Sequence, residues 1–286
     1  LDFPAHSQQR PTPNPAQPAA NRSPVTTEAQ TAQAAYAALE SDFESWLLRE
    51  NPETATALGD HRFDDRISDL SLAAMDRRAG EAQSMLDRLN AIAQPQLSAA
   101  NQVNVQIMRR QLSETVEGNR FGQRMMLFTT YAGWHQNFAG LADNMPFNSP
   151  ADYRSYLARL AQYPAMNDEA LRITQMAVDQ GYVLPCEVLG SSERSISGLI
   201  NDDPLQSRYY APFARTRPNV IDEEDWAAMQ VQARTLISSA INPALAKHRD
   251  FFVGTYMPHC TRNPSISAQP GGADYYAFRI RQETTT

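Results

Sequence analysis

The chain has 286 residues, of which 42% are hydrophobic, and a formal net charge of −7. Such a length and composition allow one large domain or two small ones, each with a hydrophobic core. The sequence has no run of about 18 apolar residues, so no membrane span is expected. The acidic excess argues against nucleic acid as a partner, because phosphate backbones attract basic surfaces.

The first 28 residues differ in composition from the rest. Residues 1–28 are mainly Pro, Gln, Ala, Asn, Ser and Thr. This segment has too few large apolar side chains to offset the entropy lost on ordering. We expect a flexible leader left after removal of a signal peptide or lipid anchor. The protein would then be periplasmic or secreted, and if the removed segment was a lipid anchor, it would be lipid-anchored before processing. The alternative is an arbitrary starting point.

Apolar residues at spacings of three and four predict helices through the first half of the chain. The first is expected over residues 27–50 and ends at Asn51-Pro52, because proline disfavours helical geometry in the residue before it. Two more are expected over residues 71–92 and 98–117. The last of these should place one apolar set on its inward face: Val103, Ile107, Met108, Leu112 and Val116.

The next part of the chain is more broken. Residues 121–148 are rich in aromatic residues and methionine, and they predict short helices and loops that line something. Further helices are expected over residues 149–163, 165–180, 185–200 and 222–255, the last interrupted or kinked at Pro243.

The end of the chain predicts a strand. Pro270-Gly271-Gly272 forms a turn signal, followed by a run rich in aromatic and alternating residues. The edge of such a strand could bind an extended peptide, with Tyr275, Tyr276 and Arg279 holding a substrate carbonyl or carboxylate. The alternative is that the tyrosines pack and the arginine is solvated. The predicted fold is therefore mainly α, with a short β-strand at the C-terminal end.

Cys186 and Cys260 are the only cysteines. Two thiols cannot hold a structural zinc ion alone, and a C-x-x-C redox spacing is absent. In an exported protein they could form a single disulfide, and otherwise they would be two unpaired buried thiols.

Motifs for catalysis are weak. No two histidines stand four apart, so no His-Glu-x-x-His zinc helix occurs. His61 lies in an acidic loop, residues 59–66, that could bind a hard cation or use its carboxylates to cap turns and pair with arginines. Gly190-Ser191-Ser192-Glu193 indicates a surface turn rather than a nucleophile. We assign no catalytic or metal-binding residue to this chain.

Three parts of the sequence, in this order, carry a family resemblance. The first is NPETATALGDHRFDD at residues 51–65. The second combines RLAQYP at 159–164 with QGYVLP at 180–185. The third runs from PAL to YMP over 243–258 and continues with PGG, YY and TT within 270–285. Together they resemble the bacterial family DUF885, and the match covers almost the whole chain after the leader.

The resemblance implies a zinc-peptidase-like fold, similar to oligopeptidases and dipeptidyl carboxypeptidases, with long helices around a deep cleft. It implies a longer protein whose zinc ligands lie beyond Thr286. Residues 29–286 would then be the helical N-terminal portion, inactive alone, that supplies one cleft wall and the substrate-binding strand. Its partners would be the C-terminal catalytic portion, in the same gene or a second chain, and a peptide substrate. The alternative is a non-catalytic helical protein that binds peptides or a partner through residues 121–147.

Overall fold

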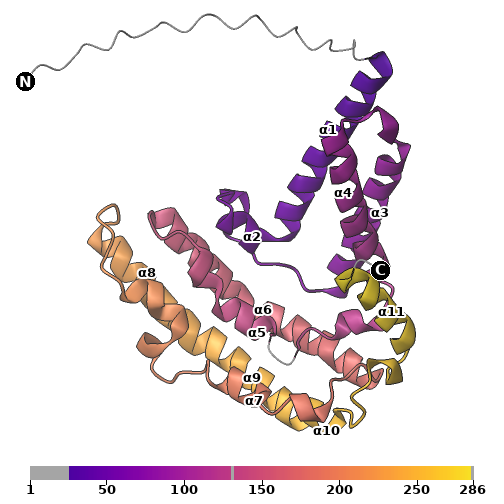
Figure 1. Ribbon diagram of the computed structural model, residues 1–286. Coiled ribbons are helices and arrows are strands. Elements are labelled where there is room, and N and C mark those ends of the chain that lie inside the picture. The colour runs from indigo at the N-terminus through magenta and orange to yellow at the C-terminus, as the bar shows by residue number, and fades with distance from the viewer. Residues whose placement is uncertain (1–25, 130–131, 285–286) are drawn as a thin grey trace, which may run out of the picture.

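The computed structural model describes residues 26–129 and 132–284, and within them the chain is predominantly helical (Figure 1). Two isolated β-bridges, Phe128–Gly133 and Pro185–Thr261, are the sole β pairing among these residues. The α-helices are α1 (Thr27–Glu50), α2 (Pro52–Ala57), α3 (Leu72–Ala91), α4 (Ala99–Gly118), α5 (Trp134–Ala139), α6 (Pro150–Asp179), α7 (Ser192–Ser197), α8 (Glu223–Leu236), α9 (Asn242–Phe251), α10 (Met257–His259) and α11 (Gly272–Glu283).

Helices α1, α3 and α4 form a bundle at the upper right of Figure 1. Their bounds confirm the predictions for residues 27–50, 71–92 and 98–117 to within one residue. Each begins at a hydroxyl N-cap, Thr26, Ser71 or Ser98, whose side chain accepts a hydrogen bond from a first-turn amide. Leucines and aromatic residues from all three helices share one core.

The inward face predicted for α4 is confirmed in part. Met108 and Leu112 are buried and Val116 packs against the same core, whereas Val103 and Ile107 are 60% and 54% exposed and Val105 is buried in their place. Both sets have helical spacing, so periodicity alone cannot choose between them. The bundle covers α4 on one side, against α3, and the second apolar stripe faces outward.

A second layer consists of α6 packed against α8 and α9, with the short helices α5 and α7 beside them (Figure 1). Its core is larger than that of the bundle and rich in aromatic residues. The break predicted at Pro164 is wrong, because α6 runs unbroken through that residue for 30 residues. Packing of α6 along its length against this core outweighs the hydrogen bond that proline removes.

Pro243 interrupts its helix in a specific way. A π-helical turn, Ile237–Ile241, separates α8 from α9, and Pro243 falls in the first turn of α9. The chain stays helical through this region, and the hydrogen bonding changes from i→i+4 to i→i+5 just before the proline, which has no N–H to donate. The predicted helix over residues 185–200 is mostly wrong, since only α7 and a single 3₁₀ turn form in it.

The predicted C-terminal strand is also wrong, because residues 272–283 form helix α11. Gly271 has φ +64°, a left-handed conformation that glycine adopts readily, and it precedes the first helical residue. A Cβ on Gly272 would lie 1.9 Å from the carbonyl oxygen of Ile266. The glycine pair therefore starts a helix that sits directly on the preceding chain.

Candidate functional site

Helix α11 holds the three residues predicted to bind substrate. Tyr275 faces inward with its ring 5.5 Å from that of Phe121. Tyr276 is 53% exposed on the outer side. Arg279 lies one turn after Tyr275 and pairs with Glu283. The structure therefore places these residues on one exposed helix beside the C-terminal end of α4. Since they do not lie on a strand, they cannot bind a peptide by adding it to a strand edge.

The two cysteines lie together. The Cys186 and Cys260 sulfurs are 1.97 Å apart in a disulfide, with Cα atoms 5.1 Å apart. Beside it, the backbone N–H of Cys186 donates to the carbonyl oxygen of Thr261 at 2.9 Å. The N–H of Leu184 donates to the Tyr256 hydroxyl at 2.8 Å. These contacts join the loop after α6 to the chain around α10.

Arg159 of α6 joins two other distant segments. Its side chain is fully buried, and its Nε donates to the carbonyl oxygen of Arg66 at 2.7 Å. One terminal nitrogen donates to Pro52 O at 3.0 Å, to Thr56 Oγ1 at 2.7 Å and to Phe63 O at 3.2 Å. Arg159 thus fixes the segment 52–66 onto the long helix.

In the acidic loop 59–66, the carboxylates cap a turn and pair with neighbouring side chains. The Asp60 side chain accepts the N–H of Arg62 at the start of a 3₁₀ turn and also pairs with the Arg62 guanidinium. Asp64 accepts the Thr56 hydroxyl at 2.6 Å and contacts His61 Nδ1 at 2.7 Å. Across the described ranges, no group of three or more His, Cys, Asp or Glu side chains is placed to hold a metal ion.

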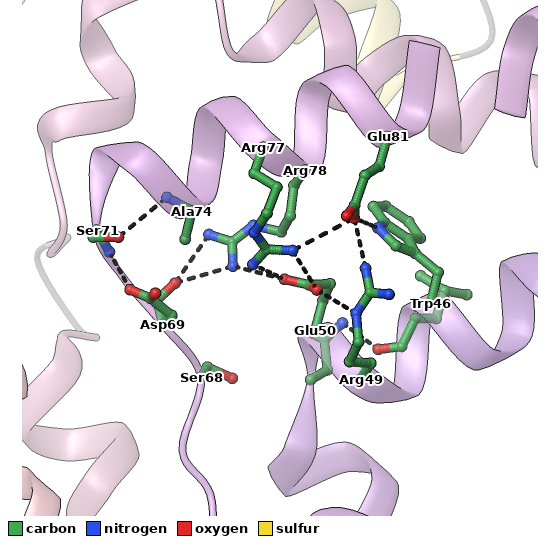
Figure 2. Close-up of polar contacts among 12 residues, drawn as sticks. Trp46, Arg49, Glu50, Ser68, Asp69, Ser71, Ala74, Arg77, Arg78 and Glu81 are labelled. Atoms are coloured by element: carbon green, nitrogen blue, oxygen red, sulfur yellow. Dashed lines mark hydrogen bonds and ion pairs between the residues drawn. The ribbon is translucent and has the colours of Figure 1, made fainter. Parts of the chain in front are cut away.

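A charged network joins the end of α1 to α3 (Figure 2). The buried Glu50 carboxylate accepts two hydrogen bonds of 2.8 Å from Arg77 and one of 2.9 Å from Arg49. Arg78 lies 3.6 Å from the same carboxylate and also donates to the Asp69 carbonyl. Burial alone would raise the pKa of Glu50, but the hydrogen bonds from Arg77 and Arg49 lower it to about 2. Both oxygens are engaged, which makes the network a clamp between helices.

This clamp predicts a specific acid sensitivity. Because the folded pKa of Glu50 lies below its ordinary value of 4.5, its contribution is present above pH 4.5 and is lost as pH falls toward 2. Replacing Glu50 with glutamine should lower the free energy of unfolding at pH 7 by about 2 kcal/mol, since the arginines are partly solvated. Urea titrations should show that the free energy of unfolding falls less in the Glu50→Gln variant than in the wild type when the pH is lowered below 4.5. Glu44→Gln, at an exposed position of α1, is the control, and equal effects of both variants would contradict the prediction.

A cavity of about 180 Å³ lies where α5, α7 and α9 approach one another. Phe128, Ile196 and Phe252 form its apolar wall. The remaining lining carries hydroxyl, amide and imidazole groups and no formally charged side chain: Thr129, His135, Gln136, Ser191, Ser192, Ser195 and His248. Thr129 and Ser191 are exposed, whereas both histidines are buried. The cavity is thus lined by both apolar and uncharged polar side chains among the described residues.

His135 and Ser195 form a hydrogen-bonded pair at this cavity. The Ser195 hydroxyl donates to the Ser192 carbonyl oxygen at 2.8 Å, so its oxygen can accept Nε2–H of His135 at 3.0 Å. Burial lowers the pKa of His135 to about 4, which keeps the ring neutral near pH 7. The pair holds α5 to α7.

His248 has a different environment. Its ring stacks on Trp134, with centroids 4.2 Å apart, and meets the His135 ring edge-on at 5.0 Å. Burial, with a smaller effect of His135, lowers its pKa to about 3. The side chain is 2% exposed, and its Nδ1 finds no hydrogen-bond partner in the described part of the chain. Its Nδ1 is therefore a polar atom enclosed by the surrounding protein.

The comparison with protein families decides the relationship. The model of a bacterial protein of unknown function, DUF885, matches residues 52–286. The chain belongs to the DUF885 family. A search of curated proteins finds no match to the DUF885 chain.

A solved structure shares the fold of the DUF885 chain. It is described as the "putative lipoprotein" from Colwellia psychrerythraea, with a TM-score of 0.75 and 15% sequence identity. The similarity covers 90% of the DUF885 chain and 46% of the other chain. The DUF885 chain therefore spans about half the length of this solved protein. Among its described helices, none has both the length and the apolar character needed to cross a membrane.

A zinc site does not fit the cavity of the DUF885 chain. Zinc in proteins takes three or four nitrogen, sulfur or carboxylate ligands. Among the residues that the structure describes, the cavity offers two imidazoles, one already bonded to Ser195, and its lining includes no Asp, Glu or Cys. No chemical step is therefore assigned to zinc at these residues.

The sequence carries only a partial signal for this cavity. Residues 121–148 are predicted to line something, and Phe128, Thr129, His135 and Gln136 do line the cavity. Ser192, in contrast, belongs to the predicted surface turn 190–193, and Ser195 only to the predicted helix 185–200. His135 and Ser195 are 60 residues apart, and only the packing of α5 against α7 brings them together.

Proposed function

We propose that this chain is the N-terminal, substrate-side part of a longer metallopeptidase-like hydrolase that works outside the cytoplasm. The observation that carries the proposal is the fold match to about half of a longer solved chain, together with DUF885 membership over residues 52–286. In this proposal the remaining part supplies zinc and the catalytic groups. The helical layer of the present chain supplies one wall of the substrate cleft.

The proposed location follows from two observations. The structural neighbour is described as a lipoprotein, a class of protein anchored outside the cytoplasm. A disulfide joins Cys186 to Cys260, and such bonds persist mainly in oxidising compartments. Both fit a periplasmic or secreted protein, and the first also fits a lipid anchor that is present before processing.

Helix α11 is the proposed contact with a peptide. Tyr276 is exposed, and Arg279 has a raised pKa: burial lowers it, but interactions with Tyr275 and Glu283 outweigh that effect. A positive guanidinium beside exposed aromatic surface suits the carboxylate end of a peptide. The alternative function, a non-catalytic peptide- or partner-binding protein, is favoured by the exposed apolar stripe Val103 and Ile107 on the neighbouring helix α4.

The test compares residues 1–286 with the complete gene product. Both are assayed for hydrolysis of a fluorogenic peptide library with zinc and with a chelator. We expect activity in the longer product that the chelator removes, and none in residues 1–286. Tyr276→Ala and Arg279→Ala should raise KM several-fold, whereas Arg249→Ala on α9 should not. Hydrolysis by residues 1–286 alone, or a zinc-loaded longer product without activity, would refute the enzyme proposal, and the second result would favour the binding protein.

A further inference from the structure

We propose that the exposed stripe of Val103 and Ile107 on α4 is the docking site for an apolar segment from the remaining half of the complete protein. The inference rests on the proposed function, in which a longer product contains that half. It names the surface of this chain on which the two halves meet.

The stripe belongs to a face of α4 that is covered along only part of its length. Positions 103, 107, 110, 114 and 117 are separated by four and three residues, so they lie on one face of the helix. Helix α11 packs over the later positions of this face, at the end of the bundle (Figure 1). Val103 and Ile107 occupy its earlier positions and are 60% and 54% exposed. The stripe therefore continues an interface that the chain already contains.

The direction of α11 indicates what should cover the stripe. Arg281 pairs with Glu117 at 2.5 Å, and the carbonyl oxygen of the next residue, Gln282, accepts a hydrogen bond of 2.6 Å from Arg110. Later residues of α11 thus meet earlier residues of α4, so the two helices run antiparallel. Val103 lies seven residues before Arg110, about 10 Å further along the axis of α4. A segment that follows α11 in the complete protein would span this distance with about three to four extended residues.

The surroundings of the stripe favour an apolar occupant with few charges. Residues 89–108 contain no Asp, Glu, Lys, Arg or His, although 20% of the whole chain is charged. The cores of protein interfaces are depleted of charged residues, because removing water from an ion is costly. Covering Val103 and Ile107 would bury apolar surface and would desolvate no ionised side chain of this segment.

The small size of the stripe favours a tethered segment over a second copy or an unrelated protein. An independent partner needs an interface of about 800 Å² on each side, far more than two side chains provide. A segment of the same protein has a high effective concentration at the stripe, so a small contact suffices. The region shared with this chain is 46% of the solved relative, and a product of that length would contain a further half to supply the segment.

The test measures thiol labelling in the complete gene product. Cys186 and Cys260 are bonded to each other, so the Val103→Cys variant adds a free thiol to a chain whose own cysteines are blocked. Val231→Cys is the matched control, because Val231 is 52% exposed on α8. With the unsubstituted product as background, a maleimide should label Val103→Cys at least about tenfold more slowly than Val231→Cys, since labelling then requires local opening. In residues 1–286 expressed alone, the two variants should react at similar rates.

Circular dichroism checks that each variant folds, and if residues 1–286 do not fold alone, the comparison within the complete product decides. Equal rates for the two variants in the complete product would overturn the inference. Slow labelling of Val103→Cys that becomes fast on dilution would identify a second copy as the occupant, and it would also overturn the inference. The enzyme proposal fails separately: a zinc-loaded complete product that hydrolyses no peptide but protects Val103→Cys would refute the hydrolase and support the docking site.

Discussion

Replacing Arg159 with alanine should lower the free energy of unfolding by about 3–4 kcal/mol, one of the largest effects expected from a single substitution in this chain. The guanidinium is fully buried and donates to three backbone carbonyl oxygens and the Thr56 hydroxyl. Alanine would remove the Arg159 donor from the Arg66 carbonyl oxygen, leave the Pro52 and Phe63 carbonyl oxygens with one donor fewer, and open a cavity beside α6. Burial lowers the pKa of Arg159, and the nearby carboxylates of Glu53, Asp64 and Asp65 act in the opposite direction.

Urea denaturation followed by circular dichroism measures this loss. Arg172→Ala is the matched control, because Arg172 lies on the same helix, half-exposed, and pairs with Glu169 at the surface. That variant should change stability by less than about 0.5 kcal/mol. Arg159→Lys should fall between the two, since one ammonium group cannot reach every acceptor. Stability of Arg159→Ala within 1 kcal/mol of wild type, roughly the error of extrapolation, would contradict the assigned role.

The bundle α1, α3 and α4 was predictable because each of its helices combines several local signals. Their N-caps Thr26, Ser71 and Ser98 and their repeating apolar residues determine where each helix begins and which residues it can bury. Local signals of this kind need no knowledge of the neighbours. The choice between the two stripes of α4 does need it, and that prediction failed at Val103 and Ile107.

Helix α11 shows a different limit. Alternating tyrosine, alanine, phenylalanine and arginine resemble a strand, yet Tyr275 and Phe278, three apart, both pack on Phe121. The deciding contact is the close approach of Gly272 to the Ile266 carbonyl, which sequence periodicity does not contain. Pro164 is a similar case, because burial of α6 outweighs a local helix-breaking signal.

The candidate site depends on packing to an even greater extent. Arg159 joins the first and second segments of the family resemblance, and the Leu184–Tyr256 contact joins the second and third, with the Cys186–Cys260 disulfide just outside both. The sequence shows these segments as three separate patterns. In the fold these three segments contact one another, which gives a physical reason for their occurrence together in one chain. His135 and His248 belong to no such sequence pattern, because the surroundings of each ring depend on residues that are distant in the sequence.

Removing the disulfide should lower the free energy of unfolding by about 3–4 kcal/mol. The bond joins residues 74 positions apart, so in the unfolded chain it closes a long loop and restricts many conformations. That loop contains α7, α8 and α9, and with them the His248 side of the cavity. The cost of losing the bond should therefore fall on the second layer rather than on the bundle α1, α3 and α4.

The measurement compares oxidised wild type, reduced wild type and the double variant Cys186→Ala/Cys260→Ala in urea. The reduced protein and the double variant should unfold at similar, lower urea concentrations, and a reductant should leave the double variant unchanged. Hydrogen exchange should rise first in α8 and α9, while α3 keeps its protection, because the bond ties only the second layer. A reductant that does not shift the wild-type transition would show that the bond does not form in solution, and it would also remove one of the two observations that support the proposed location.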